Sequence, residues 1–289
     1  MNEKLTTNYN TIQIVKLSIL NLLVILLYAP TFQMFIYDWN HDENYSHGFL
    51  VPFIVAYIIW SKKDALQKLS PAPSILGLPI LLFGLTTYVI GTIGAEWFLR
   101  RASLILVLAG VILYLYGKVY FKTLLFPLTF LFFMVPLPAI LYQGVAFQLQ
   151  LAVSFISAKL ITLTGIPVFR NGNILEVSSG PLAVEEACSG MRSIMALLAL
   201  SSLFAYLMYH SRRKQWILFG CALPIAVVTN IIRVTTTGIL AHFFGREVAE
   251  GILHASFGWL VFVIAFALLF LTSKFLDWLF PETPLNPER

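Results

Sequence analysis

The chain has 289 residues, of which 58% are hydrophobic and only 11% are charged, whereas about a quarter of the residues in soluble domains are charged. This composition excludes a soluble enzyme, because apolar runs long enough to cross ~30 Å of hydrocarbon recur along the sequence. The net charge is +5, with Lys and Arg in short clusters between the apolar runs, which argues against nucleic-acid binding.

These apolar runs predict an all-α polytopic membrane protein with about eight transmembrane helices. The second predicted span is short unless the preceding Tyr45-Ser46-His47-Gly48 enters the membrane interface. The fifth contains Pro127, Pro136 and Pro138, which should kink or end it. The first span lacks a small-x-small cleavage site, so we expect a retained anchor rather than a signal peptide. The eight spans run over about 17–37, 49–60, 75–95, 102–116, 123–142, 193–209, 216–232 and 255–272.

The orientation follows from the basic loops, because Lys and Arg are retained on the cytoplasmic side. Basic clusters follow the second, fourth and sixth spans, so we expect both termini to be cytoplasmic. The acidic loop 38–47 then lies outside, and Arg100 and Arg101 are the exception to the pattern. The basic residues in question are Lys4, Lys16, Lys62, Lys63, Lys68, Lys118, Lys122, Arg212, Arg213 and Lys214.

About fifty residues of mixed character separate the fifth and sixth spans. The segment 143–164 carries polar residues among apolar ones, which favours an interfacial helix. The alternative is a ninth span, which would move the Arg212 cluster outside. The segment 168–177 contains Arg170-Asn171-Gly172-Asn173 between β-forming residues. We therefore expect a short β-hairpin-like segment outside the membrane.

Residues suited to chemistry open the sixth span, in Glu185-Glu186-Ala187-Cys188-Ser189-Gly190-Met191-Arg192-Ser193. A thiol in the first turn of a helix lies near free backbone N–H groups and the positive end of the helix dipole. This environment lowers a cysteine pKa from about 8.5 toward the reactive range. The alternative is that Cys188 is a packing residue and the two glutamates are solvated cap charges.

Two further residues reach the same outer boundary in this topology. Arg233 ends the seventh span and His254 begins the eighth; taken singly, each is equally a polar helix-end residue. Cys221 lies 12 residues before Arg233 and so about 18 Å deeper, where it is expected to pack. Together, a cysteine, a histidine and an arginine supply a nucleophile, a general acid/base and an oxyanion-stabilising cation. This set suits acyl transfer through a thioester.

Four motifs, in the expected order along the chain, resemble those of the exosortase/archaeosortase family. The members of this family are multi-spanning membrane enzymes similar to cysteine transpeptidases. The four motifs cover essentially the whole hydrophobic chain. The motifs are Tyr45-Ser46-His47-Gly48-Phe49-Leu50-Val51-Pro52, Glu186-Ala187-Cys188-Ser189-Gly190, Asn230-x-x-Arg233 and His254-x-x-x-Gly258.

The resemblance implies that Cys188 is the nucleophile and that Arg233 and His254 complete the catalytic set. It implies substrates that are secreted proteins ending in a Pro-Glu-Pro-type signal, a membrane helix and a basic tail. It also implies a bacterial inner membrane with the active site at the extracytoplasmic face. We expect a single domain over 1–289 with its catalytic helices at about 185–273, and no additional soluble domain.

Other residues are expected to orient the catalytic set or to contact the substrate: Glu185, Glu186, Ser189, Gly190, Arg192, Asn230 and His47. No cofactor and no metal are expected, membrane lipids are expected partners, and the acyl acceptor is unknown. One alternative function is a lipid-linked glycan ligase or polymerase that uses outward-facing Arg and His. A transporter is disfavoured because almost no ionisable residues lie mid-span, and a zinc hydrolase using His41, His47, His242 and His254 lacks a His-Glu-x-x-His spacing.

Overall fold

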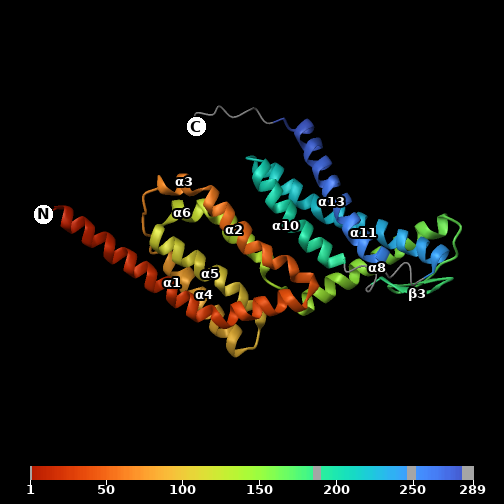
Figure 1. Ribbon diagram of the computed structural model, residues 1–289, viewed down its shortest axis with the longest axis horizontal. Helices are drawn as coiled ribbons and strands as arrows, with labels where there is room; N and C mark the ends of the chain where they lie inside the picture. The colour runs from red at the N-terminus through yellow and green to blue at the C-terminus, as the bar shows by residue number, and fades with distance from the viewer. Residues whose placement is uncertain (1, 185–189, 246–251, 282–289) are drawn as a thin grey trace. The chain divides into compact units, whose positions relative to one another are not determined.

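The computed structural model of the chain describes residues 2–184, 190–245 and 252–281 (Figure 1), and the side chains of residues 18–184, 192–245 and 259–281. The described chain is mostly helical and contains one small sheet. It divides into two compact units, Met1–Pro136 and Leu137–Arg289, which are described in turn.

Unit 1 consists of helices. Its elements are α1 (Asn2–His41), η1 (Glu43–Phe49), α2 (Leu50–Ser61), α3 (Lys63–Gln67), α4 (Gly77–Ile93), α5 (Trp97–Tyr116), α6 (Lys118–Thr123), α7 (Leu125–Phe130) and η2 (Leu131–Met134). The 3-10 helix η1 holds the Tyr45-Ser46-His47-Gly48 sequence and leads directly into the short helix α2.

Unit 2 holds the sheet and the helices of the predicted catalytic region. Its elements are α8 (Ala139–Leu163), β1 (Phe169–Asn171), β2 (Ile174–Val177), β3 (Gly180–Ala183), α10 (Gly190–Met208), α11 (Arg212–Phe244) and α13 (Ile252–Leu279). The strands form one antiparallel sheet in the order β1-β2-β3.

The predicted hairpin is confirmed. Asn171 pairs with Ile174 across a two-residue turn, and Gly172 in that turn has a φ of +62°, which glycine adopts without strain. The third strand was not predicted from the sequence. It is short and contains Gly180 and Pro181, residues that are uncommon inside strands.

Several helices have the length and composition of membrane spans. Five segments qualify within the described residues: Ser18–His41, Trp97–Tyr116, Ala139–Leu163, Arg212–Phe244 and Trp259–Leu279. Shorter apolar helices cover Gly77–Ile93, Leu125–Met134 and Arg192–Met208. The described helices thus support a membrane protein with five candidate spans, and the expected count of about eight is not confirmed. Residues 143–163 of the segment predicted to be interfacial lie in α8. This helix is long and apolar enough to cross a membrane, as the alternative of a ninth span proposed.

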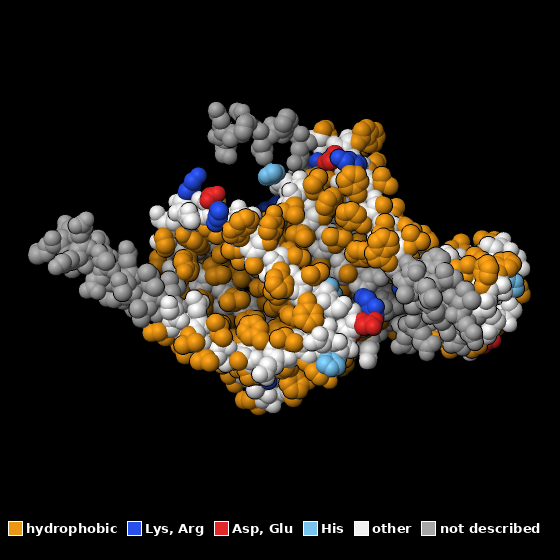
Figure 2. Space-filling model, viewed as in Figure 1, with side chains coloured by type: hydrophobic (Ala, Val, Ile, Leu, Met, Phe, Trp, Pro, Cys, Tyr) orange, Lys and Arg blue, Asp and Glu red, His pale blue; other side chains and the backbone are white. Residues whose placement is uncertain are grey.

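The surface of the protein agrees with this assignment. Large apolar side chains such as Phe53, Ile93 and Trp259 are exposed, and apolar side chains cover much of the face shown in Figure 2. Soluble monomers rarely expose large apolar patches. This surface fits helices that face lipid.

Helices α4 and α5 pack along a seam of glycines. Gly77, Gly84 and Gly91 recur every seventh residue and so lie on one face of α4. A Cβ added at Gly84 would lie 2.9 Å from the backbone nitrogen of Val107 on α5. Added at Gly77, it would lie 2.2 Å from the backbone nitrogen of Tyr114. The seam therefore requires glycine, as close helix pairs in membranes generally require small residues.

Replacing Gly84 by leucine is expected to force α4 and α5 apart and to lower stability by about 1–3 kcal/mol or more, the usual range for overpacking. Thermal unfolding of the purified protein in detergent measures the loss. Gly220→Leu on α11 is the matched control, because nothing lies within 4 Å of a Cβ added there. Equal melting temperatures for the two variants would contradict the seam.

The predicted interruption of the fifth span is confirmed at its prolines. The helical turns end at Met134, and α8 begins after Pro138. Pro136 and Pro138 have no N–H to donate to the carbonyls of the turn before them. The indole Nε1 of Trp39 instead donates to the carbonyl of Met134 at 3.1 Å, and Nε2 of His47 lies 3.1 Å from the carbonyl of Phe133. Side chains of α1 and η1 thereby satisfy the broken helix end.

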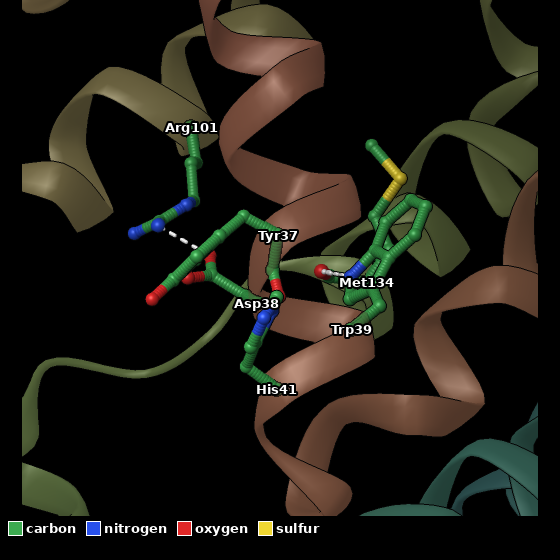
Figure 3. A network of polar contacts seen from close by, with 6 residues as sticks. All are labelled: Tyr37, Asp38, Trp39, His41, Arg101 and Met134. Atoms are coloured by element: carbon green, nitrogen blue, oxygen red, sulfur yellow. Dashed lines mark hydrogen bonds and ion pairs between the residues drawn. The ribbon is translucent and has the colours of Figure 1, made fainter.

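The two arginines that departed from the basic-loop pattern have local partners in unit 1. The guanidinium of Arg101, which is buried, forms an ion pair with Asp38 near the end of α1 (Figure 3). The guanidinium of Arg100 lies over the ring of Tyr88, 5.6 Å from its centroid. A buried arginine needs such a partner, so this pair fixes α1 against α5.

Candidate functional site

Helix α11 carries two predicted site residues, Asn230 and Arg233, and is longer than expected. The sequence predicted its end near Ile232, but the helix continues to Phe244. Arg233 lies 233 − 212 = 21 residues from Arg212 at the start of the helix, or about 31 Å at 1.5 Å per residue. This distance equals the thickness of a bilayer core. The turns after Arg233 therefore extend beyond one membrane thickness from the basic end.

The extension of α11 is held in place by the sheet and by α8. Leu175, Leu182 and Val184 form one core cluster with Ile231 and Val234 of α11, together with Val153, Ile161 and Ile166. A Cβ added at Gly238 would lie 2.6 Å from Cδ1 of Ile161. Burial of these side chains explains why the helix does not end at Ile232. The sheet thus packs on α11 at and beyond the level of Arg233.

Helix α10 runs antiparallel to α11 (Figure 1). Ile194 and Leu197 near its start cluster with Ala222 and Ala226, whereas Ala205 and Tyr209 near its end cluster with Leu218. The start of α10 therefore lies toward the part of α11 that carries Arg233. Gly190, where α10 begins, lies level with the part of α11 that carries Asn230 and Arg233.

Helix α13 also runs antiparallel to α11. Asp277 near its end forms an ion pair with Lys214 at 3.0 Å, and Ala265 clusters with Ala222 and Ala226. The first turns of α13 therefore extend toward the same end of unit 2 as Arg233. His254 belongs to this first part of the helix; its side chain lies outside the described set.

The described site residues are a buried amide and two partly buried arginines. Asn230 is 8% exposed. Arg233 and Arg192, the third residue of α10, are half-buried, and the Nε atom of each is buried. Both arginine side chains have interaction partners. A buried guanidinium acts with less screening by water, which strengthens its effect on a nearby anion.

The segment with the predicted nucleophile joins two fixed points. Glu185, Glu186, Cys188 and Ser189 lie outside the described residues, so their predicted roles stay predictions. On one side, Val184 is fully buried, and its N–H donates to the carbonyl of Asn173 at 3.0 Å. On the other side, Gly190 begins α10. Both flanking points lie beside the part of α11 that carries Asn230 and Arg233.

His47 belongs to unit 1, where it is half-buried in η1. Burial lowers the pKa of its imidazole below the ordinary value, although hydrogen bonds to the backbone of Phe133 and Asn44 act in the opposite direction. The described contacts of His47 thus tie η1 to the proline break. Its expected contact with substrate stays a prediction.

The lowered pKa of His47 makes the fold sensitive to acid. The unfolded chain takes up a proton at a higher pH than the folded chain does, so stability is fully present above about pH 6.5 and falls as the pH drops below it. We expect the melting temperature to decrease between pH 7.5 and pH 5.5 more steeply for the wild type than for His47→Gln, which keeps an N–H donor. If the melting temperatures of the wild type and His47→Gln fall equally with pH, the imidazole of His47 is not responsible for the loss of stability in acid.

Two features of this region were missed by sequence reasoning. The third strand is one, and the hydrogen bond between Ser178 and Nδ1 of His242, at 2.6 Å, is the other. This bond fixes the β2–β3 turn to the end of α11. The weak signal for β3 was the turn sequence Ser178-Ser179-Gly180 directly after the predicted hairpin. No sequence signal pointed to the Ser178–His242 contact.

Among the described residues, no three His, Cys, Asp or Glu side chains are placed to hold a metal ion. Two of the histidines considered for zinc have other contacts: Nδ1 of His41 lies 2.8 Å from the carbonyl of Tyr37, and His242 bonds to Ser178. Cys221 is half-buried within α11.

Comparison with known proteins gives one match. The family model described as transmembrane exosortase (Exosortase_EpsH) matches residues 39–271. The matched range includes η1, the sheet and nearly all of the helices of unit 2. No curated protein and no solved structure matches the chain.

Proposed function

Because the chain belongs to the transmembrane exosortase family, we propose that it is a cysteine transpeptidase or protease that cleaves the C-terminal sorting signal of secreted proteins. One observation carries the proposal. The starts of α10 and α13 extend toward the end of unit 2 where Arg233 of α11 lies, and the segment with Cys188 joins this end to the sheet.

In the proposed first step, His254 takes the proton of Cys188 and the thiolate attacks the carbonyl carbon of the scissile peptide bond. The tetrahedral intermediate collapses, the C–N bond breaks, and His254 gives its proton to the leaving amine. The acyl group remains on sulfur as a thioester. Water or an acceptor amine or hydroxyl then attacks the thioester, and the free thiol is restored.

Arg233 is proposed to stabilise the oxyanion of this intermediate. Its half-buried guanidinium presents several N–H donors in a fixed fork, and backbone N–H groups near Ser189 and Gly190 are proposed as further donors. Removal of one such donor typically costs about 2.7–4 kcal/mol in the transition state. Asn230, Glu186 and Glu185 are proposed to orient the catalytic groups or to contact the basic tail of the substrate, and Arg192 to support them.

The proposed substrate has a Pro-Glu-Pro-type signal followed by a membrane helix and a basic tail. The proposed site faces the extracytoplasmic side of a bacterial inner membrane, with both termini of the chain in the cytoplasm. The exposed apolar side chains of the helices offer a lipid-facing surface along which a substrate helix can approach laterally.

The test is co-expression of the chain with a model substrate that carries the signal, the helix and the basic tail. A smaller substrate band on a gel is expected only when the chain is present. A matched substrate with Ala-Glu-Ala in place of Pro-Glu-Pro is expected to stay full length. Equal cleavage of both substrates would overturn the proposed specificity, and no cleavage of any signal variant would favour the glycan-ligase alternative.

A further inference from the structure

The third strand of the sheet is an edge strand among the described residues and leads into the predicted catalytic segment. The sheet order β1-β2-β3 makes β3 an edge strand. Leu182 is buried, whereas Pro181 is exposed. Only four residues separate Ala183, the last residue of β3, from Cys188.

The register of the sheet determines which backbone groups of β3 point outward. The N–H of Val184 donates to the carbonyl of Asn173, and Leu182 pairs with Leu175. Because hydrogen-bonded pairs alternate along an antiparallel ladder, the backbone groups of residues 180, 182 and 184 face β2. Those of Pro181 and Ala183 face away from it. Pro181 fits this reading, since proline in a sheet occupies positions whose nitrogen is not needed by the ladder.

The outer edge of β3 therefore offers three hydrogen-bonding groups: the carbonyl of Pro181 and both the N–H and the carbonyl of Ala183. Neither residue forms a hydrogen bond to another described group on this side. An edge of this kind binds extended peptides by strand addition. The missing N–H of Pro181 restricts which partner strands fit.

We infer that the sorting signal of the substrate adds to the sheet as a parallel strand beside β3, with its glutamate bonded between Pro181 and Ala183. This inference rests on the proposed function, because it names how the substrate of that same site is held. The occupant is an extended peptide whose alternate residues lack N–H groups.

The hydrogen-bonding pattern of Pro-Glu-Pro matches this edge. In a strand, neighbouring residues direct their backbone groups to opposite edges, so both proline nitrogens point away from β3 while the glutamate faces it. In a parallel pair of strands, the N–H and the carbonyl of one residue bond to the two residues that flank its partner on the other strand. The glutamate N–H donates to the carbonyl of Pro181, and the N–H of Ala183 donates to the glutamate carbonyl. The residue two positions after the glutamate donates to the carbonyl of Ala183.

The direction of the strand also fits the substrate. β3 runs N- to C-terminally toward α10, an apolar helix. A parallel substrate strand runs the same way, so that its own membrane helix follows the signal as α10 follows β3. An antiparallel strand would carry the substrate helix away from α10.

Two sets of variants test the strand addition, using the full-length protein in detergent and a synthetic substrate with signal, helix and tail. On the enzyme, Ala183→Pro removes the outward N–H and is expected to raise KM about tenfold or more, because one donor is lost and its partner carbonyl is left unpaired. Arg170→Pro, the matched control, places a proline at an outward position of β1 on the opposite edge of the same sheet and is expected to keep the wild-type KM.

On the substrate, N-methylation of the glutamate removes the N–H that should donate to Pro181, and it is expected to raise KM by a similar factor on the wild-type enzyme. This arm does not depend on whether Ala183→Pro folds. N-methylation of a residue well before the signal is the control. Equal processing of the substrate with and without glutamate N-methylation overturns the strand addition and leaves the proposed function intact. Failure to process the unmodified substrate overturns the proposed function itself.

Discussion

Cys188→Ala is expected to abolish processing of the model substrate. Without the sulfur no thioester forms, and loss of a nucleophile from a catalytic set typically costs on the order of 10⁴–10⁶ in rate. The expected result on the gel is a full-length substrate band at all times. Intact mass measurement of the wild-type protein should in addition detect an acylated species that disappears with hydroxylamine, which cleaves thioesters.

The matched control is Cys221→Ala. Cys221 lies within α11, twelve residues before Arg233, and is expected to serve only packing. Its replacement should leave processing within about twofold of the wild type, the range of a small packing change. Both variants should elute as the wild type does on size exclusion in detergent. Processing by a folded Cys188→Ala protein would refute the thioester mechanism.

Arg233→Gln is expected to lower kcat by about 10²–10³-fold, the usual cost of one oxyanion donor. Lysine at this position keeps the charge but not the planar fork of donors, so Arg233→Lys is expected to recover only part of the rate. Substrate binding should change less than turnover, because an oxyanion contact is made in the transition state rather than in the ground state.

Arg170→Gln is the control for this loss. Arg170 is an exposed arginine on β1 whose Nη1 donates to the carbonyl of Gly172 and whose guanidinium lies 5.5 Å from the ring centroid of Phe155. Its replacement removes the same charge from the same unit and should leave kcat unchanged. If Arg170→Gln lowers kcat as much as Arg233→Gln does, general electrostatics rather than an oxyanion contact is responsible. If Arg233→Gln raises KM alone, Arg233 binds substrate.

Features with local causes were predictable from the sequence. The turn at Gly172 and the break at Pro136 and Pro138 follow from backbone conformations that single residues impose. The membrane character follows from composition. The length of α11 was not predictable, because the turns beyond Ile232 are held by contacts with residues far away in the sequence, such as Ile161 against Gly238.

For the candidate site, the sequence predicted the directions of three helices. The order of the apolar runs and the basic loops brought residues of three helices to one boundary, and the described helices run in the directions that this requires. Of the sheet that packs beside Arg233, only the hairpin of β1 and β2 was predicted. The strand β3 forms because it pairs with β2 and not because its own residues favour a strand. The roles of Cys188, Arg233 and His254 stay predictions.

The glycine seam between α4 and α5 limits how the length of this chain can change. Each residue turns an α-helix by about 100°, so one residue inserted between Gly84 and Gly91 would rotate Gly91 off the face that meets Arg100. A bulkier side chain would then face the backbone of α5. Insertions and deletions within α4 should therefore be selected against.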